Sequence, residues 1–260
     1  MPFIELHTVD STNNYALRQI HAGLAQHGMA VFSHEQSAGK GQRGKKWLSA
    51  RGLNIAISIL LKPAPLALTD QFRLSACVAL SVYELFRKYA GDNVAIKWPN
   101  DLYWKDRKAG GILIESIVKS RETTVRSREL GVGSQQSTVG NWEWAVVGIG
   151  ININQDSFPP GLPNPVSLRE ITEKKSEPVE LAKELCRIFN SRFDELIHAG
   201  FENIYRQYVA HLYKLDQKVK LKKDNRVFEA TIKGVSKSGR LIVQHGIEEE
   251  FDFGTIEWII

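Results

Sequence analysis

Several residue types that mark whole classes of protein are scarce in this sequence of 260 residues. The 2 cysteines, Cys77 and Cys186, are too few for a disulfide framework or a zinc ligand set. The longest apolar run, Ile55 to Leu61, is interrupted by Ser58 and is far shorter than the roughly 20 residues that a membrane span needs. The N-terminus lacks the basic and apolar regions of a secretion signal. We therefore expect a soluble, cytoplasmic protein that is not associated with a membrane.

The composition is that of an ordinary globular protein, with 43% apolar and 24% charged residues. The formal net charge of +5 suits a nucleic acid, a phosphorylated small molecule or an acidic partner surface, and equally a solvated surface with a few extra lysines. The 7 histidines show no metal-ligand spacing, so the sequence indicates no metal site. It also contains no G-x-S-x-G nucleophile motif.

Hydrophobic periodicity predicts an α+β fold in the first four-fifths of the chain. Helical spacing indicates a helix that follows the possible N-cap residues Asp10 to Asn13, and further helices over 70–89, 179–199 and 201–213. Strand patterns occupy 3–7, 29–34, 53–61, 94–98, 102–104, 111–118 and 144–154. The alternation in 53–61 predicts a strand that is buried on one face. The polar segment Lys119 to Asn141 is predicted to be an insertion in a hairpin.

After Leu215 the pattern changes to five short strands separated by turn residues, among them the strand KVKLKK, and no helical spacing remains. Short strands of this kind predict a small β-barrel. The expected organisation is therefore a larger domain over residues 1–213 and a barrel over 214–260.

The loop Gly39 to Trp47 concentrates glycines and cations. It contains G-x-G-x-x-G, but a strand pattern follows where a dinucleotide-binding fold needs a helix. It also comes close to a P-loop, but Lys46 stands where Ser or Thr would hold magnesium. Glycines let the backbone approach an anion and the cations attract it, so we predict phosphate binding here; the alternative is a flexible loop with solvated lysines.

Two further clusters follow. In the predicted hairpin that ends in RKAGGILIE, Lys108 begins a strand beside two glycines and offers a point charge to a carboxylate or phosphate. Asp101, in the preceding KWPND, either orients a cation or caps a turn. The apolar strand Val147 to Asn154 carries two glycines and an amide, which suit a planar ligand or mark a β-bulge.

The order of these clusters resembles the biotin–protein ligase family, the biotin–[acetyl-CoA-carboxylase] ligases. The specific part of the resemblance is KWPND at Lys97 to Asp101 followed by RKAGGILIE at Arg107 to Glu115, supported by GIGIN at Gly148 to Asn152. It implies a class II synthetase-like catalytic domain, with a mixed and antiparallel sheet and helices, followed by an SH3-like barrel. It also implies ATP and biotin as substrates, Mg²⁺ with the ATP, a biotinyl-5′-AMP intermediate and transfer to a lysine.

The resemblance assigns residues to each ligand. The catalytic residue is Lys108. The biotin site comprises Ser11, Thr12, Asn13, Gln36, Gly39, Lys40, Gly41, Gln42, Trp47, Lys108, Gly111 and Gly148. The ATP and adenylate site comprises Lys40, Gln42, Arg43, Lys45, Asn100, Asp101, Lys108 and Asn152. The family loop usually has arginine where this chain has Lys40 and Gln42, so the hold on the adenylate is in question.

The implied partner is a biotin carboxyl carrier domain of a carboxylase, and the lysines of KVKLKK are candidates to meet its acidic surface. Because the sequence starts at the catalytic domain, we expect no DNA binding, and a monomer or homodimer. A lipoate–protein ligase is the closest alternative enzyme. A non-catalytic biotin-binding or nucleic-acid-binding module is the alternative from another class.

Overall fold

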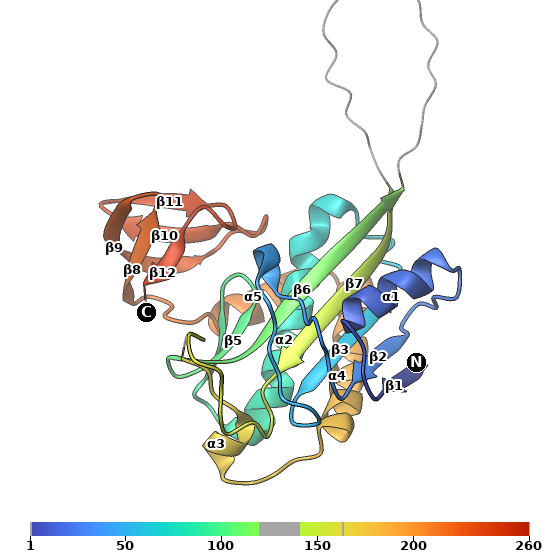
Figure 1. Cartoon of the computed structure of the whole chain (residues 1–260). Helices are drawn as coiled ribbons and strands as arrows, with labels where there is room; N and C mark the ends of the chain where they lie inside the picture. Colours follow the sequence, from blue (N-terminus) through green and yellow to red (C-terminus); the bar gives the residue numbers. More distant parts are fainter. Residues whose placement is uncertain (1, 120–140, 163, 260) are drawn as a thin grey trace, which may run out of the picture.

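A computed structural model describes residues 2–119, 141–162 and 164–259. The predicted insertion between Lys119 and Asn141 therefore lies outside the described residues, apart from those two end residues. Figure 1 shows a larger body built on one sheet and a smaller all-strand unit beside it.

The larger body is built on a seven-stranded sheet in the order β1-β2-β3-β7-β6-β5-β4. Only β1 and β2 pair in parallel, so the sheet is mixed and mostly antiparallel, as predicted. Its strands are β1 (Phe3–Leu6), β2 (Ala30–Ser33), β3 (Ile55–Leu61), β4 (Val94–Lys97), β5 (Asp101–Trp104), β6 (Arg107–Lys119) and β7 (Asn141–Ile151). The long β6–β7 hairpin carries two of the three sequence clusters to the middle of the sheet.

Helices cover both faces of this sheet. On one face α1 (Thr12–His21) packs over β3 and β7, where Ala16, Leu60 and Val146 belong to a small apolar cluster. The main core lies on the other face, under α2 (Gln71–Ala90), α3 (Leu168–Thr172), α4 (Pro178–His198) and α5 (Glu202–Ala210). Short 3₁₀ turns occupy Gln42–Gly44 and Leu68–Asp70.

Strand β3 corrects one prediction. The sequence predicts one buried face, but all seven residues of Ile55–Leu61 are buried. Ile55, Ile57 and Ile59 face the main core, as their spacing predicts, whereas Leu60 packs in the cluster under α1. Ser58 could pass for a solvent-facing residue because it is polar, but it hydrogen-bonds to the start of α1.

The C-terminal unit is an antiparallel sheet in the order β11-β10-β9-β8-β12. Its strands are β8 (Lys218–Lys223), β9 (Arg226–Val235), β10 (Leu241–His245), β11 (Ile247–Phe251) and β12 (Glu257–Ile259). Apolar residues on alternate positions, such as Leu221, Ile232 and Val243, are fully buried inside it. The predicted α+β fold with an appended small barrel is thereby confirmed.

Other local predictions need adjustment. Ser11 is the N-cap residue of α1, but its side chain makes no capping bond. Helix α5 ends at Ala210, three residues before its predicted end at 213, because the backbone at His211 to Tyr213 pairs with Ile96 of β4 instead. Helix α3 is not predicted, although Ser167 and Glu170 form a capping box at its start. Both cysteines are free and buried. None of the helices within the described ranges is long and apolar enough for a bilayer span.

Candidate functional site

A cavity lies where the start of α1, the glycine-rich loop and the β6–β7 hairpin meet. It holds about 470 Å³ of space between protein atoms, including its open mouth. Its lining residues come from all three sequence clusters and from the start of α1: Ser11, Thr12, Asn13, Gln36, Lys40, Gly41, Gln42, Trp47, Asn100, Asp101, Lys108, Gly111, Ile112, Leu113, Gly148, Ile149 and Gly150. Residues up to 139 positions apart in the sequence thus share one wall.

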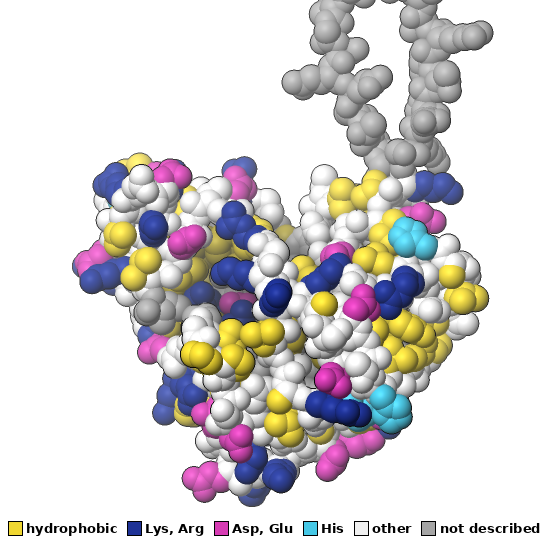
Figure 2. All heavy atoms as spheres, viewed as in Figure 1, with side chains coloured by type: hydrophobic (Ala, Val, Ile, Leu, Met, Phe, Trp, Pro, Cys, Tyr) yellow, Lys and Arg dark blue, Asp and Glu magenta, His cyan; other side chains and the backbone are white. Residues whose placement is uncertain are grey.

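A groove continues from this cavity toward the barrel, because Gln42, Asn100, Ile112 and Leu113 line both. Arg43 of the glycine-rich loop and Arg240 of the barrel both line the groove. Figure 2 shows the surface hollowed between the barrel and the larger body, with Lys and Arg side chains on both sides. This half of the site is therefore suited to anionic ligands.

The inner end of the cavity is polar but uncharged. Ser11, Thr12 and Asn13 are all at most 4% exposed. The backbone N–H of Thr12 donates to Oε1 of Gln36 (2.8 Å), so the Gln36 side chain satisfies a helix-start donor that Ser11 leaves unpaired. Ser58 Oγ lies 2.8 Å from Thr12 Oγ1 and 2.5 Å from Asn13 Oδ1. These bonds fix the orientations of the polar groups that face the cavity.

The glycines of β7 make room for two neighbouring side chains. A Cβ atom on Gly148 would overlap the Asn13 amide, with Cγ of Asn13 at 2.9 Å. A Cβ atom on Gly150 would overlap the indole of Trp47, with Nε1 at 2.8 Å. Real Cβ contacts of this length are essentially absent from proteins. The β7 pairing with β3 and β6 is regular at both glycines, which favours close approach over the bulge alternative.

The glycine-rich loop folds back on itself as a small hairpin. Lys40 pairs with Lys46 in an antiparallel bridge, the N–H of Gly41 donates to the carbonyl of Lys45 (2.7 Å) and the N–H of Trp47 donates to that of Gly39 (2.9 Å). Arg43 and Gly44 at its tip have φ values of 56° and 75°, in the left-handed region. No helix follows before β3, which agrees with the rejection of the dinucleotide-binding and P-loop motifs.

Side chains of the loop contact two separate parts of the molecule. Nζ of Lys40 lies 3.3 Å from Oε1 of Glu115, and Nε2 of Gln42 donates to the carbonyl of Ile112 (3.3 Å), both on β6. Arg43 does not line the cavity, and its guanidinium lies 5.9 Å from the ring centre of Phe253 in the barrel. The loop therefore bridges the sheet and the barrel.

A β-bulge aims Lys108 at the cavity. Along the β5–β6 pair Asp101 stands opposite Gly111, but Tyr103 stands opposite Lys108, so β6 has one extra residue between them. This extra residue places the Lys108 side chain on the same face as Asp101 and Gly111, although an odd number of positions separates Lys108 from Gly111. Nζ of Lys108 lies 2.6 Å from Oδ1 of Asp101. The sequence leaves the role of Asp101 open, and in the structure its carboxylate orients a cation.

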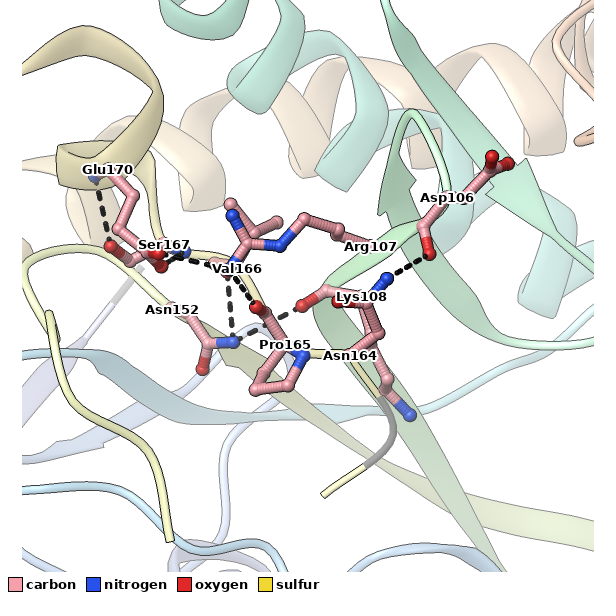
Figure 3. Close-up of polar contacts among 9 residues, drawn as sticks. All are labelled: Asp106, Arg107, Lys108, Asn152, Asn164, Pro165, Val166, Ser167 and Glu170. Atoms are coloured by element: carbon pink, nitrogen blue, oxygen red, sulfur yellow. Dashed lines mark hydrogen bonds and ion pairs between the residues drawn. The ribbon is translucent and has the colours of Figure 1, made fainter. Parts of the chain in front are cut away.

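Asn152 has a different setting from the other predicted ligand residues. It is 4% exposed and is not among the cavity-lining residues. Its amide nitrogen donates to the carbonyl of Val166 (3.1 Å) and, at 3.4 Å, to that of Lys108, as Figure 3 shows. It therefore joins β6 to the segment 164–170, which we call the strap.

The strap runs alongside the start of β6 (Figure 3). The N–H of Lys108 donates to the carbonyl of Asn164 (2.8 Å), and the carbonyl of Lys108 accepts from the N–H of Val166 (2.9 Å). Arg107 donates to the carbonyl of Pro165 and pairs with Glu170 at 2.9 Å. Both backbone polar groups of Lys108 are thus held by the strap, while its side chain is held by Asp101.

Lys97 stands opposite Asp101 in the β4–β5 pair, so its side chain lies on the same face of the sheet as those of Asp101 and Lys108. Its Nζ is 5.1 Å from the ring centre of Tyr103 and 5.2 Å from that of Trp258. The pKa of Lys97 is lowered to about 8, chiefly by burial; the charge of Asp101 raises this pKa, and the charges of Lys108 and Lys45 lower it. The ammonium is stabilised by two ring faces rather than by a close carboxylate.

Most residues that the sequence assigns to the site lie together around the cavity; of the described ones, Gly39, Arg43, Lys45 and Asn152 do not line it. Sequence reasoning missed Ile112, Leu113, Ile149 and Gly150, which line the cavity, and Ser58 and Glu115, which hydrogen-bond to residues that do. Five of these six belong to quoted motifs: Ile112, Leu113 and Glu115 to RKAGGILIE, and Ile149 and Gly150 to GIGIN.

Comparisons with known proteins show which family this chain resembles. Residues 6–134 match the model of the Biotin/lipoate A/B protein ligase family, and residues 214–257 match the Biotin protein ligase C terminal domain. The chain is 31% identical over 243 residues to a biotin–[acetyl-CoA-carboxylase] ligase of Paracoccus denitrificans, covering 90% of this chain and 91% of the relative.

Two further similarities are informative. The bifunctional ligase/repressor BirA of Escherichia coli is 42% identical over 112 residues, which is 42% of this chain and 33% of BirA, so the match spans about a third of that relative. The structure of biotin protein ligase from Aquifex aeolicus in complex with biotin and ATP is similar, with a TM-score of 0.77 at 24% identity, covering 99% of this chain and 98% of that one. This likeness concerns the fold.

The long match to the Paracoccus relative carries the assignment; one family model covers residues 6–134 of the larger body, and the other covers residues 214–257 in the barrel. The cavity is lined by the same motifs on which the sequence resemblance depends. This chain therefore belongs to the biotin protein ligase family.

Proposed function

We propose that this chain is a biotin–protein ligase, which activates biotin with ATP and transfers it to a lysine of a biotin carboxyl carrier domain, as in acetyl-CoA carboxylase or a related carboxylase. The observation that carries the proposal is the arrangement of the cavity. An uncharged polar end suits the ureido ring of biotin, and a cationic end around Lys40 and Lys108 suits a carboxylate and a phosphate.

The proposed biotin site consists of Ser11, Thr12, Asn13, Gln36, Gly39, Lys40, Gly41, Gln42, Trp47, Lys108, Gly111 and Gly148. The proposed ATP site consists of Lys40, Gln42, Arg43, Lys45, Asn100, Asp101, Lys108 and Asn152. Residues 1–213 form the proposed catalytic domain and residues 214–260 the proposed barrel domain. The groove that Arg43 and Arg240 line supports nucleotide binding near the barrel.

The first step joins biotin to AMP. A carboxylate oxygen of biotin attacks the α-phosphorus of ATP, the bond from this phosphorus to the β-phosphate oxygen breaks, and pyrophosphate leaves. Negative charge builds up on the α-phosphate oxygens in the transition state. Lys108, which Asp101 and the strap already orient, stabilises this charge without reorganisation during the reaction.

The second step transfers the biotinyl group. The neutral ε-amine of a carrier lysine attacks the acyl carbon, the bond from this carbon to the phosphate oxygen breaks, and AMP leaves while the amine loses a proton. The glycine-rich loop keeps water away from the anhydride in the interval. No side chain of this chain forms a covalent bond with the substrate.

Magnesium enters this scheme with the ATP. Within the described residues no group of three or more His, Cys, Asp or Glu side chains could hold a metal ion. Mg²⁺ usually binds through substrate phosphates and one or two carboxylates. The ion would neutralise the pyrophosphate when bound.

A streptavidin blot tests the proposal. A purified biotin carrier domain is incubated with the chain, biotin and Mg-ATP, beside a lane without ATP. We expect an ATP-dependent signal that falls about 10²–10³-fold in initial rate with Lys108→Ala, because one transition-state contact is lost. Lys119→Ala, on the exposed end of the same strand, is the matched control and should keep the original rate.

Two outcomes would contradict the proposal. A near-normal rate with Lys108→Ala would remove the catalytic role of that lysine. A blank blot, with biotin still bound in calorimetry, would indicate a sensor or a ligase for another acyl group. Competition between biotin and lipoate tests the second case, because the matched family model includes both kinds of ligase.

A further inference from the structure

Glu115 on β6 contacts two parts of the site at once. Its Oε2 accepts from Nδ2 of Asn13 (2.7 Å) and its Oε1 lies 3.3 Å from Nζ of Lys40. We propose that Glu115 is a positioning residue that latches the glycine-rich loop over the cavity and sets the orientation of the Asn13 amide. Its catalytic consequence rests on the proposed function; the latch itself does not.

The contact with Asn13 fixes which way the amide faces. A carboxylate only accepts hydrogen bonds, so the NH₂ group of Asn13 must point at Glu115 and the carbonyl oxygen must point at Ser58. The Asn13 side chain also rests against the backbone of Gly148, which leaves it little freedom to rotate. Glu115 thereby determines what Asn13 offers to a ligand.

The contact with Lys40 joins the loop to the sheet. Lys40 and Gln42 stand on either side of Gly41 and both contact β6, so the first half of the loop is held across the cavity. The ammonium of Lys40 has three N–H donors. When one of them bonds to Glu115, the other two remain for an anion in the cavity. The loop can thus be closed before a ligand arrives.

The ion pair between Lys40 and Glu115 is weak because both side chains are partly exposed to solvent. The side chains of Lys40 and Glu115 are 37% and 31% exposed, so solvent screens the pair. Pairs of this kind change an equilibrium by about twofold to fivefold. A contact of that size biases the loop toward closure and still allows it to open for substrate entry and product release.

The rate of trypsin cleavage within the loop measures how readily the latch opens, because Arg43, Lys45 and Lys46 are cleavage sites in the loop. This measurement needs neither biotin nor ATP. We expect Glu115→Gln to speed cleavage after Lys45 and Lys46 about twofold to fivefold in the free protein, measured by mass spectrometry. Glutamine keeps the size of the side chain and an acceptor for Asn13. Glu143→Gln, which removes an exposed negative charge from the adjacent strand β7, is the matched control and should leave the rate unchanged.

A double-mutant cycle separates the latch from a general loss of structure. Lys40→Gln lies in the loop, so it tests the pair even if Glu115→Gln were to disturb folding. If the two residues act through one contact, each single variant speeds cleavage and the double variant is no faster than either. Additive effects, or cleavage of Glu115→Gln at the original rate, would overturn the proposal.

Retention of the adenylate gives the catalytic readout. We expect Glu115→Gln to release preformed biotinyl-5′-AMP about twofold to fivefold faster while the rate of its formation changes less. The charge-reversed pair, Lys40→Glu with Glu115→Lys, should restore slow trypsin cleavage but not retention, since Lys40 also faces the ligand. If no adenylate forms, the proposed function fails; the trypsin results stand or fall independently.

Discussion

Gly150 shows how one missing side chain shapes the cavity. We expect Gly150→Ala to weaken biotin binding tenfold or more, because its Cβ atom would displace the indole of Trp47, and overpacking costs about 1–3 kcal/mol. Trp47 pairs with Gly39 through the backbone, so its movement would disturb the glycine-rich loop as well. Isothermal titration calorimetry with biotin measures the loss.

The double variant Gly150→Ala with Trp47→Leu provides the check. Leucine removes the indole atoms that the new methyl group would meet, so the double variant should bind biotin better than Gly150→Ala alone. If Gly150→Ala bound biotin as the original chain does, the close approach of the indole would have no part in forming the site.

Single residues were predictable where a motif already implied a charge or a close approach. Lys108 follows from its position beside two glycines, and Gly148 from its place in a very apolar strand. Ser58 and Glu115 were not predictable, because their roles depend on α1 crossing the face where β3, β7 and β6 lie side by side. That neighbourhood is set by strand order, and no local pattern encodes strand order.

At the scale of elements, one arginine contacts the strap at two points. Arg107 donates to the carbonyl of Pro165 and pairs with Glu170, whose second oxygen accepts from the N–H of Ser167 (2.9 Å). The strap contacts both the backbone of Lys108 and the side chain of Asn152, and Asn152 belongs only to the proposed ATP site. We therefore expect Arg107→Ala to raise the KM for ATP about fivefold with little change in biotin affinity. The pair is partly exposed, so about 1 kcal/mol is a fair measure of its contribution.

The neighbouring pair of Arg169 and Asp156 supplies the control. Arg169→Ala breaks an ion pair of the same length, 2.9 Å, in the same segment, but it does not touch β6. Its KM for ATP should stay close to the original value. Equal effects of Arg107→Ala and Arg169→Ala on steady-state kinetics would show that the strap does not position Lys108.

The helices and strands themselves were largely predictable, since periodicity of the buried residues determines them. The errors occur where tertiary contacts override that periodicity. Residues 211–213 continue a helical pattern but pair with Ile96, and β3 looks half-exposed until α1 covers its second face. Helix α3 has five residues, too few to show a period.

At the scale of the whole molecule, the barrel packs against the turn that carries KWPND. Nε1 of Trp98 donates to the carbonyl of Gly239 (2.9 Å), and its ring meets that of Phe253 edge-on at 6.2 Å. Tyr205 on α5 donates to the carbonyl of Val235 (2.7 Å). The barrel is thus attached beside the proposed nucleotide groove, and a loss of docking should disturb both KWPND and the loop that Arg43 anchors.

The lysines of KVKLKK make a weaker case for carrier docking than the sequence alone suggests. Lys220 stands opposite Glu229 on β9, and Lys222 opposite Glu257 on β12, so carboxylates interrupt the basic strip. We expect the combined Lys218→Ser and Lys220→Ser variant to raise the KM for the carrier domain less than threefold, since exposed charges of this kind each contribute only about 0.3 kcal/mol. Initial rates at varied carrier concentration measure it, and a tenfold increase would instead establish the strip as the docking surface.

Lys97 links barrel docking to pH. Its pKa of about 8 in the folded chain is below the ordinary 10.5 that it regains on unfolding, so between these values the unfolded chain binds more protons. The free energy of unfolding therefore rises with pH between about 8 and 10.5. Below about pH 8 this gain in stability is absent, because Lys97 is protonated in both states. The Lys97→Met variant has no titratable group at this position. We expect the stability of the original chain relative to this variant to increase by about 2 kcal/mol between pH 7 and 10, measured by urea unfolding.

Comparison with Lys97→Met isolates this titration, because the raised pKa values of Tyr103 and Tyr213 act in both proteins. Lys220→Met, an exposed lysine of the barrel, should show a difference that does not vary with pH. The Lys97 ammonium lies against Trp258 of the last strand, so it stays buried only while the barrel is docked. A pH-independent difference for Lys97→Met would mean that Lys97 is hydrated in the folded chain and that the barrel does not seal this side of the site.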